Sequence, residues 1–238
     1  MENTEQKEIV KKDSKLKQNQ IAGAIIIAGL LIAGAILIKG SAFNSSVKSI
    51  SRELGLNQKA FAKCRIGEEA KKTVQANQDS GIKAGAQGTP YSVLVAKDGK
   101  KYVISGAYPY EEVKKIIDSI LAGTAINNVP IELMPVSQNE YINGNINAEI
   151  IVVEYSDPEC PFSKRFHTTM QQVVKDYKGK VAWVFRFFPL DSIHQKARNE
   201  SEAIQCAGML KGKETFWKYL DKVFEITTSN DGLDPALL

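Results

Sequence analysis

Cysteine is scarce in this sequence, with three residues among 238, and histidine is scarcer still, with two. Three cysteines are too few for the disulfide framework of a small secreted domain. Two histidines far apart, with no paired cysteines, give no metal-ligand spacing, so we expect no metal site. Because the cysteine count is odd, at least one thiol is unpaired within the chain, and such a thiol can be reactive.

The sequence also lacks a strong excess of either positive or negative charge. The chain has 31 Lys and Arg against 27 Asp and Glu, a net charge of +4, and no run of like charge dominates it. This small, scattered excess does not favour nucleic acid as a partner, and we expect no nucleic acid and no cofactor. The apolar content of 43% can support a core, and the length suits one domain with an appendage or two small domains.

One long apolar run, Ile21 to Ile38, holds 18 residues without a polar side chain. As a helix it would rise about 27 Å, close to the ~30 Å hydrocarbon core of a bilayer. We therefore predict a transmembrane helix over residues 21–38 that serves as an uncleaved anchor. A buried helix and a cleaved signal peptide are the alternatives, although the run is long for a signal peptide and Lys39-Gly40-Ser41-Ala42 is a poor cleavage site.

The residues that flank this run predict its orientation. Residues 1–20 are polar and form a predicted cytoplasmic tail, whereas residues 39–46 form a linker. The positive-inside rule favours a cytoplasmic N-terminus, and hence a single-pass protein of the cell membrane with an extracytoplasmic body. The basic residues before the span are Lys7, Lys11, Lys12, Lys15 and Lys17, and those after it are Lys39, Lys48 and Arg52.

Residues 47–121 begin with helical periodicity and continue with a hairpin pattern. We predict short helices first, then a strand over Tyr91–Ala96 and its partner over Lys101–Ser105. Asp98-Gly99 between them is typical of a two-residue hairpin turn. Pro109 then opens a helix with an apolar stripe at helical spacing.

Residues 122–148 are predicted to be a connector that contains one short strand, near Ile131–Met134. Residues 149–238 open on the run Ile150–Tyr155, which is typical of a central buried strand. This strand is followed by a helix from Cys160, a strand over 181–188 and two helices near 192–210 and 214–225. At the end of the sequence we expect Leu237 and Leu238 to be exposed.

Cys160 stands out by its position, directly after a buried strand and before Pro161, a residue that favours the first position of a helix. Unpaired backbone N–H groups and the helix dipole stabilise a thiolate at a helix N-terminus. The thiolate is the nucleophile of disulfide exchange, so we predict that Cys160 is the working thiol. An inert buried cysteine is the alternative.

Ser163 limits what this site can do. A dithiol enzyme carries a second thiol three residues beyond the first, with two residues between them, where it releases a mixed disulfide by attacking it. The hydroxyl of Ser163 cannot do so, although it can hydrogen-bond the Cys160 thiolate. The segment Cys160-Pro161-Phe162-Ser163 therefore permits attack and capture but not self-resolution.

Two stretches of the chain carry a set of short motifs beyond the Cys160 segment. The motifs are Val153-Glu154-Tyr155-Ser156-Asp157, Cys160-Pro161-Phe162, Lys164-Arg165-Phe166-His167, Phe188-Pro189-Leu190-Asp191, His194, Cys206-Ala207-Gly208, Phe216-Trp217, Gly88-Thr89-Pro90 and Ser105-Gly106-Ala107. With these motifs, the stretch from about Ile131 to Leu238 resembles the first half of the DsbA-like disulfide oxidoreductases of the thioredoxin superfamily, and the stretch from about Ser46 to Leu121 resembles the second half. This resemblance implies an α/β fold, a thioredoxin-like mixed sheet with a helical insertion.

The order of the two halves is inverted relative to the family. The simplest interpretation is a circular permutation, in which the old ends are joined through about residues 122–130. Nine residues reach up to roughly 30 Å, which is ample for that join. A gene-joining artefact and two half-domains that complete one another between chains are the alternatives.

The resemblance also implies roles for individual residues. Thr89-Pro90 would be a cis-proline loop that lies against Cys160 and, with Pro161 and Phe162, binds substrate. Glu154 would be the buried acid that handles protons, unless it is an ordinary strand carboxylate. Cys64 and Cys206 are expected to be buried inert thiols, although one of them could resolve Cys160. His167 and His194 are expected to be structural rather than catalytic.

These residues predict a membrane-anchored protein that exchanges thiols and disulfides on exported protein substrates through one catalytic cysteine. An isomerase-like or reductase-like reaction is favoured, because resolution must come from a substrate thiol, a small thiol or a redox partner. A redox-inactive chaperone or peptide-binding module that uses the same groove is the main alternative. A partner protein dimerised through Cys160 is another.

Overall fold

A computed structural model of the chain describes residues 48–238. The predicted tail, membrane span and linker, residues 1–46, lie outside the described residues. Within the described part, no helix has both the length and the apolar character needed to cross a bilayer.

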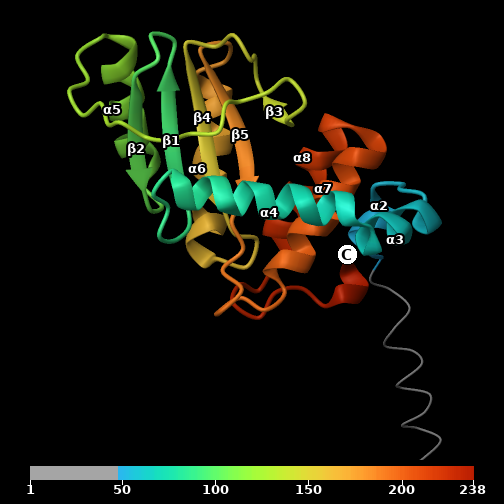
Figure 1. Ribbon diagram of the computed structural model, residues 1–238. Helices are drawn as coiled ribbons and strands as arrows, with labels where there is room; N and C mark the ends of the chain where they lie inside the picture. Colours follow the sequence, from blue (N-terminus) through green and yellow to red (C-terminus); the bar gives the residue numbers. More distant parts are fainter. Residues whose placement is uncertain (1–47) are drawn as a thin grey trace, which may run out of the picture. The chain divides into compact units, whose positions relative to one another are not determined.

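The fold is built on a mixed sheet with strand order β2-β1-β4-β5-β3 (Figure 1). The central pair, β4 and β5, is parallel, and the other neighbouring pairs are antiparallel. Both central strands are almost completely buried, which explains why their sequences are nearly continuous apolar runs. The strands are β1 (Tyr91–Ala96), β2 (Lys101–Ser105), β3 (Ile142–Asn143), β4 (Ile150–Ser156) and β5 (Val181–Phe187).

Both strands of the predicted hairpin are confirmed at their predicted bounds, but the predicted two-residue turn is wrong, because residues 97–100 separate the strands. Gly99 adopts a φ of 84°, a left-handed conformation that glycine tolerates at no steric cost. The carboxylate of Asp98 accepts the backbone N–H of Lys100 at 3.0 Å, which fastens the turn. β1 also pairs with β4, so the hairpin forms one side of the sheet.

Helices cover both faces of the sheet. Apolar residues of α5, α6 and α8 pack on one face with Val152 and Trp183, whereas the end of α4 and the connector cover the other face at Val153 and Val184. α7 packs against α8, α4 and α3. The helices are α2 (Ile50–Glu53), α3 (Gln58–Ile66), α4 (Glu68–Lys83), α5 (Tyr110–Leu121), α6 (Pro161–Asp176), α7 (Ala197–Lys211) and α8 (Lys213–Ile226), with a 3₁₀ turn at Pro235–Leu237.

The close contact between α4 and the sheet depends on Gly81. A Cβ atom at this position would lie 2.6 Å from Phe188 and 2.8 Å from Tyr155. Real Cβ contacts are longer, so only glycine allows α4 to approach the sheet this closely.

The connector corrects one prediction. No strand forms over Ile131–Met134; the short edge strand is β3, at Ile142–Asn143. The predicted piece lies between Pro130 and Pro135, which cannot donate to a ladder. The connector is instead fixed by Arg186 of β5, whose Nε donates to Glu140 Oε1 at 2.8 Å.

A second correction concerns the last residues of the sequence. Leu238 is buried in the core rather than exposed, and Leu237 is partly buried. The carbonyl oxygen of Leu238 accepts the backbone N–H of Ser51 at 3.1 Å and the hydroxyl of Tyr219 at 2.8 Å. These contacts join the last residues to α2 and α8, and Figure 1 shows the C-terminus beside α2.

Candidate functional site

Cys160 is the N-cap of α6, and Pro161 is the first residue of that helix, as predicted. β4 ends at Ser156, and a short turn closed by the Cys160 N–H on the carbonyl of Asp157, at 3.1 Å, leads into the helix. The cysteine is 4% exposed and is the free thiol of the chain. The orphan N–H groups of the first turn of α6 therefore lie next to this sulfur, where they favour negative charge.

The Thr89-Pro90 loop lies against Cys160 within the same chain. The peptide bond between these two residues is cis, as the resemblance implied. The thiol of Cys160 donates to the carbonyl oxygen of Thr89 at 3.4 Å. β1 begins directly after Pro90, so the loop is held by a central part of the sheet.

Ser163 lies one turn into α6 and is fully buried. Its hydroxyl oxygen accepts the backbone N–H of Asp157 at 3.4 Å. Among the described residues it makes no hydrogen bond with Cys160. Ser163 therefore fixes the turn before the cysteine rather than contacting the sulfur in this structure.

Glu154 lies inside the sheet on β4 with no exposed surface. Its Oε2 accepts the indole N–H of Trp183 at 2.9 Å. Burial raises the pKa of this carboxyl to about 7, against the lowering effect of Ser156 and Trp183. A group that titrates near neutral pH can both take and return a proton, as the proposed role requires.

Asp157 organises the turn between β4 and Cys160. Its two carboxylate oxygens accept the N–H groups of Glu159 and Leu190, each at 2.7 Å. His194 Nδ1 lies 3.0 Å from Asp157 Oδ2. His194 is therefore structural, as expected, whereas the sequence reasoning assigned no role to Asp157.

His167 is structural as well. It is buried on α6, and its Nε2 lies 2.7 Å from Asp221 Oδ1. Its ring centroid is 5.1 Å from that of Trp183. The side chain thus joins α6 to α8 and to the sheet rather than to Cys160.

Two buried acids beside the site, Glu159 and Glu200, were missed by the sequence reasoning. A Cβ at Gly232 would lie 2.7 Å from an oxygen of each, so the two carboxyls approach the same point. Burial raises the pKa of both, that of Glu200 to about 7. In the part of the chain that the structure describes, no acid or histidine cluster is suited to hold a metal ion.

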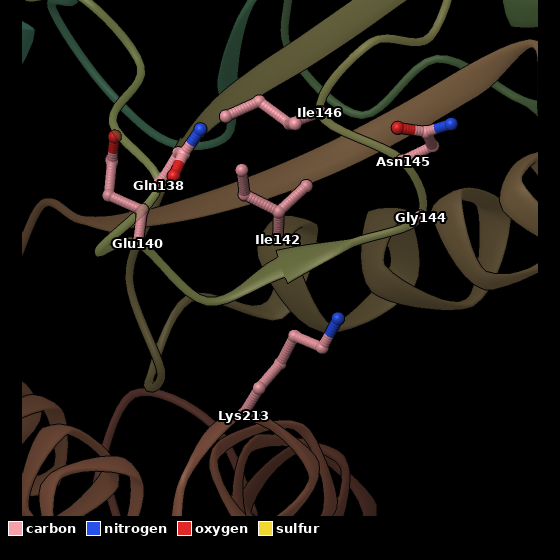
Figure 2. A pocket seen from close by; sticks show the side chains of 7 residues that line it. All are labelled: Gln138, Glu140, Ile142, Gly144, Asn145, Ile146 and Lys213. Atoms are coloured by element: carbon pink, nitrogen blue, oxygen red, sulfur yellow. The ribbon is translucent and has the colours of Figure 1, made fainter.

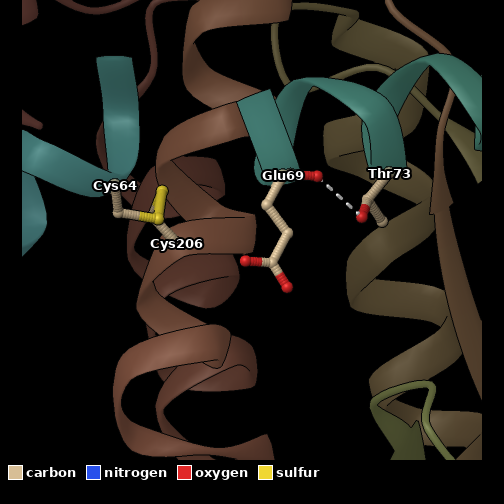
Figure 3. Close-up of a disulfide and its surroundings, with 4 residues drawn as sticks. All are labelled: Cys64, Glu69, Thr73 and Cys206. Carbon is tan, nitrogen blue, oxygen red and sulfur yellow. Dashed lines mark hydrogen bonds between the residues drawn. A yellow bond between two sulfur atoms is a disulfide. The ribbon is translucent and has the colours of Figure 1, made fainter. Parts of the chain in front are cut away.

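The prediction for Cys64 and Cys206 is wrong, because the two form a disulfide with each other (Figure 3). The Cα atoms lie 5.8 Å apart, within the range that a disulfide requires. Packing of α3 on α7 brings the cysteines together across 142 residues of sequence, a proximity that no local pattern reports. While this bond is intact, neither sulfur is available to resolve Cys160.

Phe162 provides apolar surface next to the buried thiol, with 54% of the residue exposed. The guanidinium carbon of Arg165 lies 5.3 Å from the centre of its ring, a cation–π contact. Arg165 Nη2 also reaches the carbonyl oxygen of Ala107 at 3.5 Å, beside the exposed Tyr108. Arg165 thus contacts the exposed ring of Phe162 and the backbone next to Tyr108.

A pocket of about 420 Å³ lies elsewhere, beside the edge strand β3 (Figure 2). None of its lining residues belongs to the Cys160 site, so we assign it no part in the chemistry. The lining residues are Gln138, Glu140, Ile142, Gly144, Asn145, Ile146 and Lys213.

Comparison with known families gives two matches that divide the chain. A model of the DSBA-like thioredoxin domain matches residues 32–118. A second model, described as thioredoxin, matches residues 137–234. The segment between the matches, residues 119–136, holds the end of α5 and the first part of the connector.

Comparison with curated proteins gives partial matches to Na⁺/H⁺ antiporters. NhaA 1 of Mycolicibacterium vanbaalenii is 32% identical over 94 residues, which are 39% of this chain and 15% of the relative. NhaA 3 of Salinispora tropica is 32% identical over 108 residues, or 44% and 16%. The chain thus spans less than a fifth of the length of these relatives.

Among solved structures, Pseudomonas aeruginosa DsbA2 is similar, with 29% identity, a TM-score of 0.39, and coverage of 42% of this chain and 54% of that one.

Proposed function

We propose that this chain, a DsbA-like protein of the thioredoxin superfamily, exchanges thiols and disulfides on exported protein substrates through Cys160. The observation that carries the proposal is the juxtaposition of a free cysteine at a helix N-terminus with a cis-proline loop 3.4 Å away. The buried acid Glu154, whose pKa is raised to about 7, lies on the strand that leads to the cysteine.

The proposed reaction begins with attack of the Cys160 thiolate on a substrate disulfide. A bond forms between Cys160 Sγ and one substrate sulfur, the substrate S–S bond breaks, and the other substrate sulfur leaves as a thiolate that takes up a proton. Glu154 accepts the proton that Cys160 loses when its thiol ionises. The exposed backbone beside Thr89-Pro90 and the ring of Phe162 bind the extended substrate chain.

Release of the substrate then depends on a thiol from outside the Cys160 site. Attack by a second substrate thiol regenerates Cys160 and leaves a rearranged disulfide, which is isomerisation without net oxidation. Attack by a small thiol or a redox partner on Cys160 Sγ instead releases the substrate as a thiol and leaves Cys160 joined to the attacking sulfur. A second thiol then attacks that bond, frees Cys160 and leaves as the oxidised disulfide, so two outside thiols supply the two electrons that reduce the substrate. Ser163 and the bonded pair Cys64–Cys206 support this dependence, because neither supplies the second thiol.

We further propose that the domain is a circular permutation completed within one chain. Its support is the two family matches on either side of residues 119–136 and the contact of Thr89 with Cys160 across the halves. In the family order, residues 231–235 would continue into residues 46–47. The hydrogen bond between Ser51 and Leu238 is consistent with that junction.

The membrane anchor is part of the proposal. Residues 21–38 would hold the exchange domain at the outer face of the cell membrane, with the N-terminus cytoplasmic. Protease digestion of intact cells, followed by blotting for a tag at each end of the chain, would test this orientation. Protection of a C-terminal tag would overturn it.

Trapping tests the exchange function. A variant with Cys64→Ala and Cys206→Ala keeps Cys160 as its one cysteine, and we expect it to form a mixed disulfide with a model peptide disulfide, detected by mass spectrometry. Adding Cys160→Ala should abolish the adduct. An equal rate of peptide reduction with and without Cys160 would refute the proposal.

A chaperone-like binding module is the second candidate, favoured by an exposed Phe162 beside a thiol that is only 4% exposed. Ser163→Cys distinguishes the two. Gain of dithiol oxidase activity on a reduced peptide would support a working redox site that lacks its second thiol. Peptide binding without any gain of exchange would favour the binding module.

A further inference from the structure

Three side-chain oxygens that have no hydrogen-bond partner among the described residues lie on β1 and β4, the strands that adjoin the Thr89-Pro90 loop and the Cys160 turn. They are Ser92 Oγ, Glu154 Oε1 and Ser156 Oγ, and all three residues have no exposed surface. Ser92 and Glu154 are directly paired in the antiparallel register of β1 and β4. Ser156 is two residues beyond Glu154 on β4, so all three side chains point to the same face.

This face of the sheet is otherwise apolar. Leu94, Ile104, Val152 and Phe185 are its neighbours in the core. A buried polar group without a partner costs about 1–3 kcal/mol, so three such groups in one apolar layer would destabilise the fold if they only filled space. Alanine would fill either serine position at lower cost, which indicates that the hydroxyls act on Glu154.

The spacing allows that action. Side chains directly opposite one another in an antiparallel pair have Cβ atoms about 5 Å apart, and residues two apart along a strand are separated by about 7 Å. A glutamate side chain spans such distances, and a serine hydroxyl rotates freely to donate its hydrogen. Trp183 Nε1 already donates to Oε2 at 2.9 Å, which leaves Oε1 for the serines.

On the basis of the function proposed above, we infer that Ser92 and Ser156 are positioning residues that donate hydrogen bonds to Glu154 Oε1. They favour the ionised form of this carboxyl, the form that accepts the proton of Cys160. Ser92 follows Pro90 by two residues and Ser156 precedes Cys160 by four. The two hydroxyls therefore connect Glu154 to both segments of the site.

Stabilisation of the ionised Glu154 carboxyl depends on the two serine hydroxyls and on Trp183. Burial is the main cause of the raised pKa of Glu154, Ser156 and Trp183 oppose it, and no charged side chain contributes among the described residues. Of the titratable groups on α6, His167 packs on Trp183 but bonds Asp221, and Cys160 faces Thr89. A hydrogen bond to the charged form favours ionisation, so loss of one serine hydroxyl should favour the protonated acid.

The test is to measure the titration midpoint of the Glu154 carboxyl in the parent and in each serine variant. NMR on protein labelled at its glutamate side chains reports this midpoint. We expect Ser92→Ala and Ser156→Ala each to move the midpoint upward by about half to one pH unit, with additive effects in the double variant. Ser156→Thr keeps a hydroxyl and should restore the parent midpoint. Ser201→Ala removes a buried hydroxyl that bonds the carbonyl of Ala197 in α7, and should change nothing.

Exchange kinetics provide the second readout. The pH at which Cys160 reaches half its maximal rate of reaction with a peptide disulfide should rise in parallel, with a roughly three- to tenfold loss of rate at pH 6. In a Glu154→Gln background, the serine substitutions should have no further effect. Folded Ser92→Ala and Ser156→Ala proteins with the parent Glu154 midpoint would overturn the inference. Absence of exchange by the parent, with the midpoints shifted as expected, would instead overturn the proposed function alone.

Discussion

Glu159 and Glu200 are unusual residues because both carry buried carboxyls near one another and near the thiol. Glu200 Oε1 accepts the backbone N–H of Leu233, whereas neither oxygen of Glu159 has a hydrogen-bond partner among the described residues. The backbone carbonyl of Glu159 accepts the N–H of Asn230 at 2.8 Å, so the same residue also holds the segment before the last 3₁₀ turn. A proton on one of these acids removes the repulsion between them.

In an intermediate pH range, Glu200 is protonated in the folded protein and ionised in the unfolded chain. The free energy of unfolding should therefore fall as the pH rises through this range. The pKa of Glu200 is about 4.5 in the unfolded chain and is raised to about 7 in the fold. Stability from this proton is present below about pH 4.5 and is lost by about pH 7. Glu200→Gln should stabilise the protein at pH 7.5 by on the order of 2–3 kcal/mol in urea unfolding.

The matched control is Glu111→Gln, an exposed glutamate at the start of α5, which should change stability little. Because other buried acids remain, the pH dependence in Glu200→Gln should weaken rather than vanish. If Glu200→Gln and the parent have the same free energy of unfolding at pH 7.5, the raised pKa assigned to Glu200 is contradicted.

Sequence reasoning reached Cys160 from a local pattern of strand, proline and helix start, whereas the roles of Thr89, Pro90 and Glu154 came only from the resemblance to a known family. It missed Glu159 and Glu200, since an acid within a polar turn or a helix is ordinary in sequence and only the folded chain buries it. Glu200 packs against Leu233, 33 residues away. No local signal reports such a contact.

At the scale of elements, the approach of α4 to the sheet is the most constrained contact. Gly81→Ala would place a methyl group against Phe188 and Tyr155 and should cost about 1–3 kcal/mol, measured by thermal or urea unfolding. Gly88→Ala is the control, since its added methyl group meets nothing within 4 Å. Equal stability of the two variants would show that α4 shifts without cost.

Elements with a long, regular pattern were predicted well. β1 and β2 match their predicted bounds, and α5 begins one residue after Pro109. β3 was missed because two residues cannot show an alternation, and its pairing with β5 depends on where the connector crosses the sheet. Tertiary contact decides that position, and the flanking sequence does not.

At the scale of the whole molecule, the disulfide between α3 and α7 joins the two family-matched halves covalently. A cross-link that closes so long a loop restricts the unfolded chain strongly. Cys64→Ala with Cys206→Ala should lower the free energy of unfolding by about 3–5 kcal/mol.

Cys160→Ala, which keeps the disulfide, should cost far less in the same assay. The parent treated with a reductant should unfold like the double variant. If reduction leaves the midpoint unchanged, the disulfide contributes nothing to stability.

The same bond has a topological consequence. Cys64 and Cys206 close a covalent ring of backbone that contains Thr89, Cys160 and the whole connector. A single cut in the connector opens this ring without separating the fragments, so the site would be held by one bridge and by the sheet. Limited proteolysis there should give one band on a non-reducing gel and two bands after reduction, and the nicked protein should still capture a peptide disulfide at Cys160.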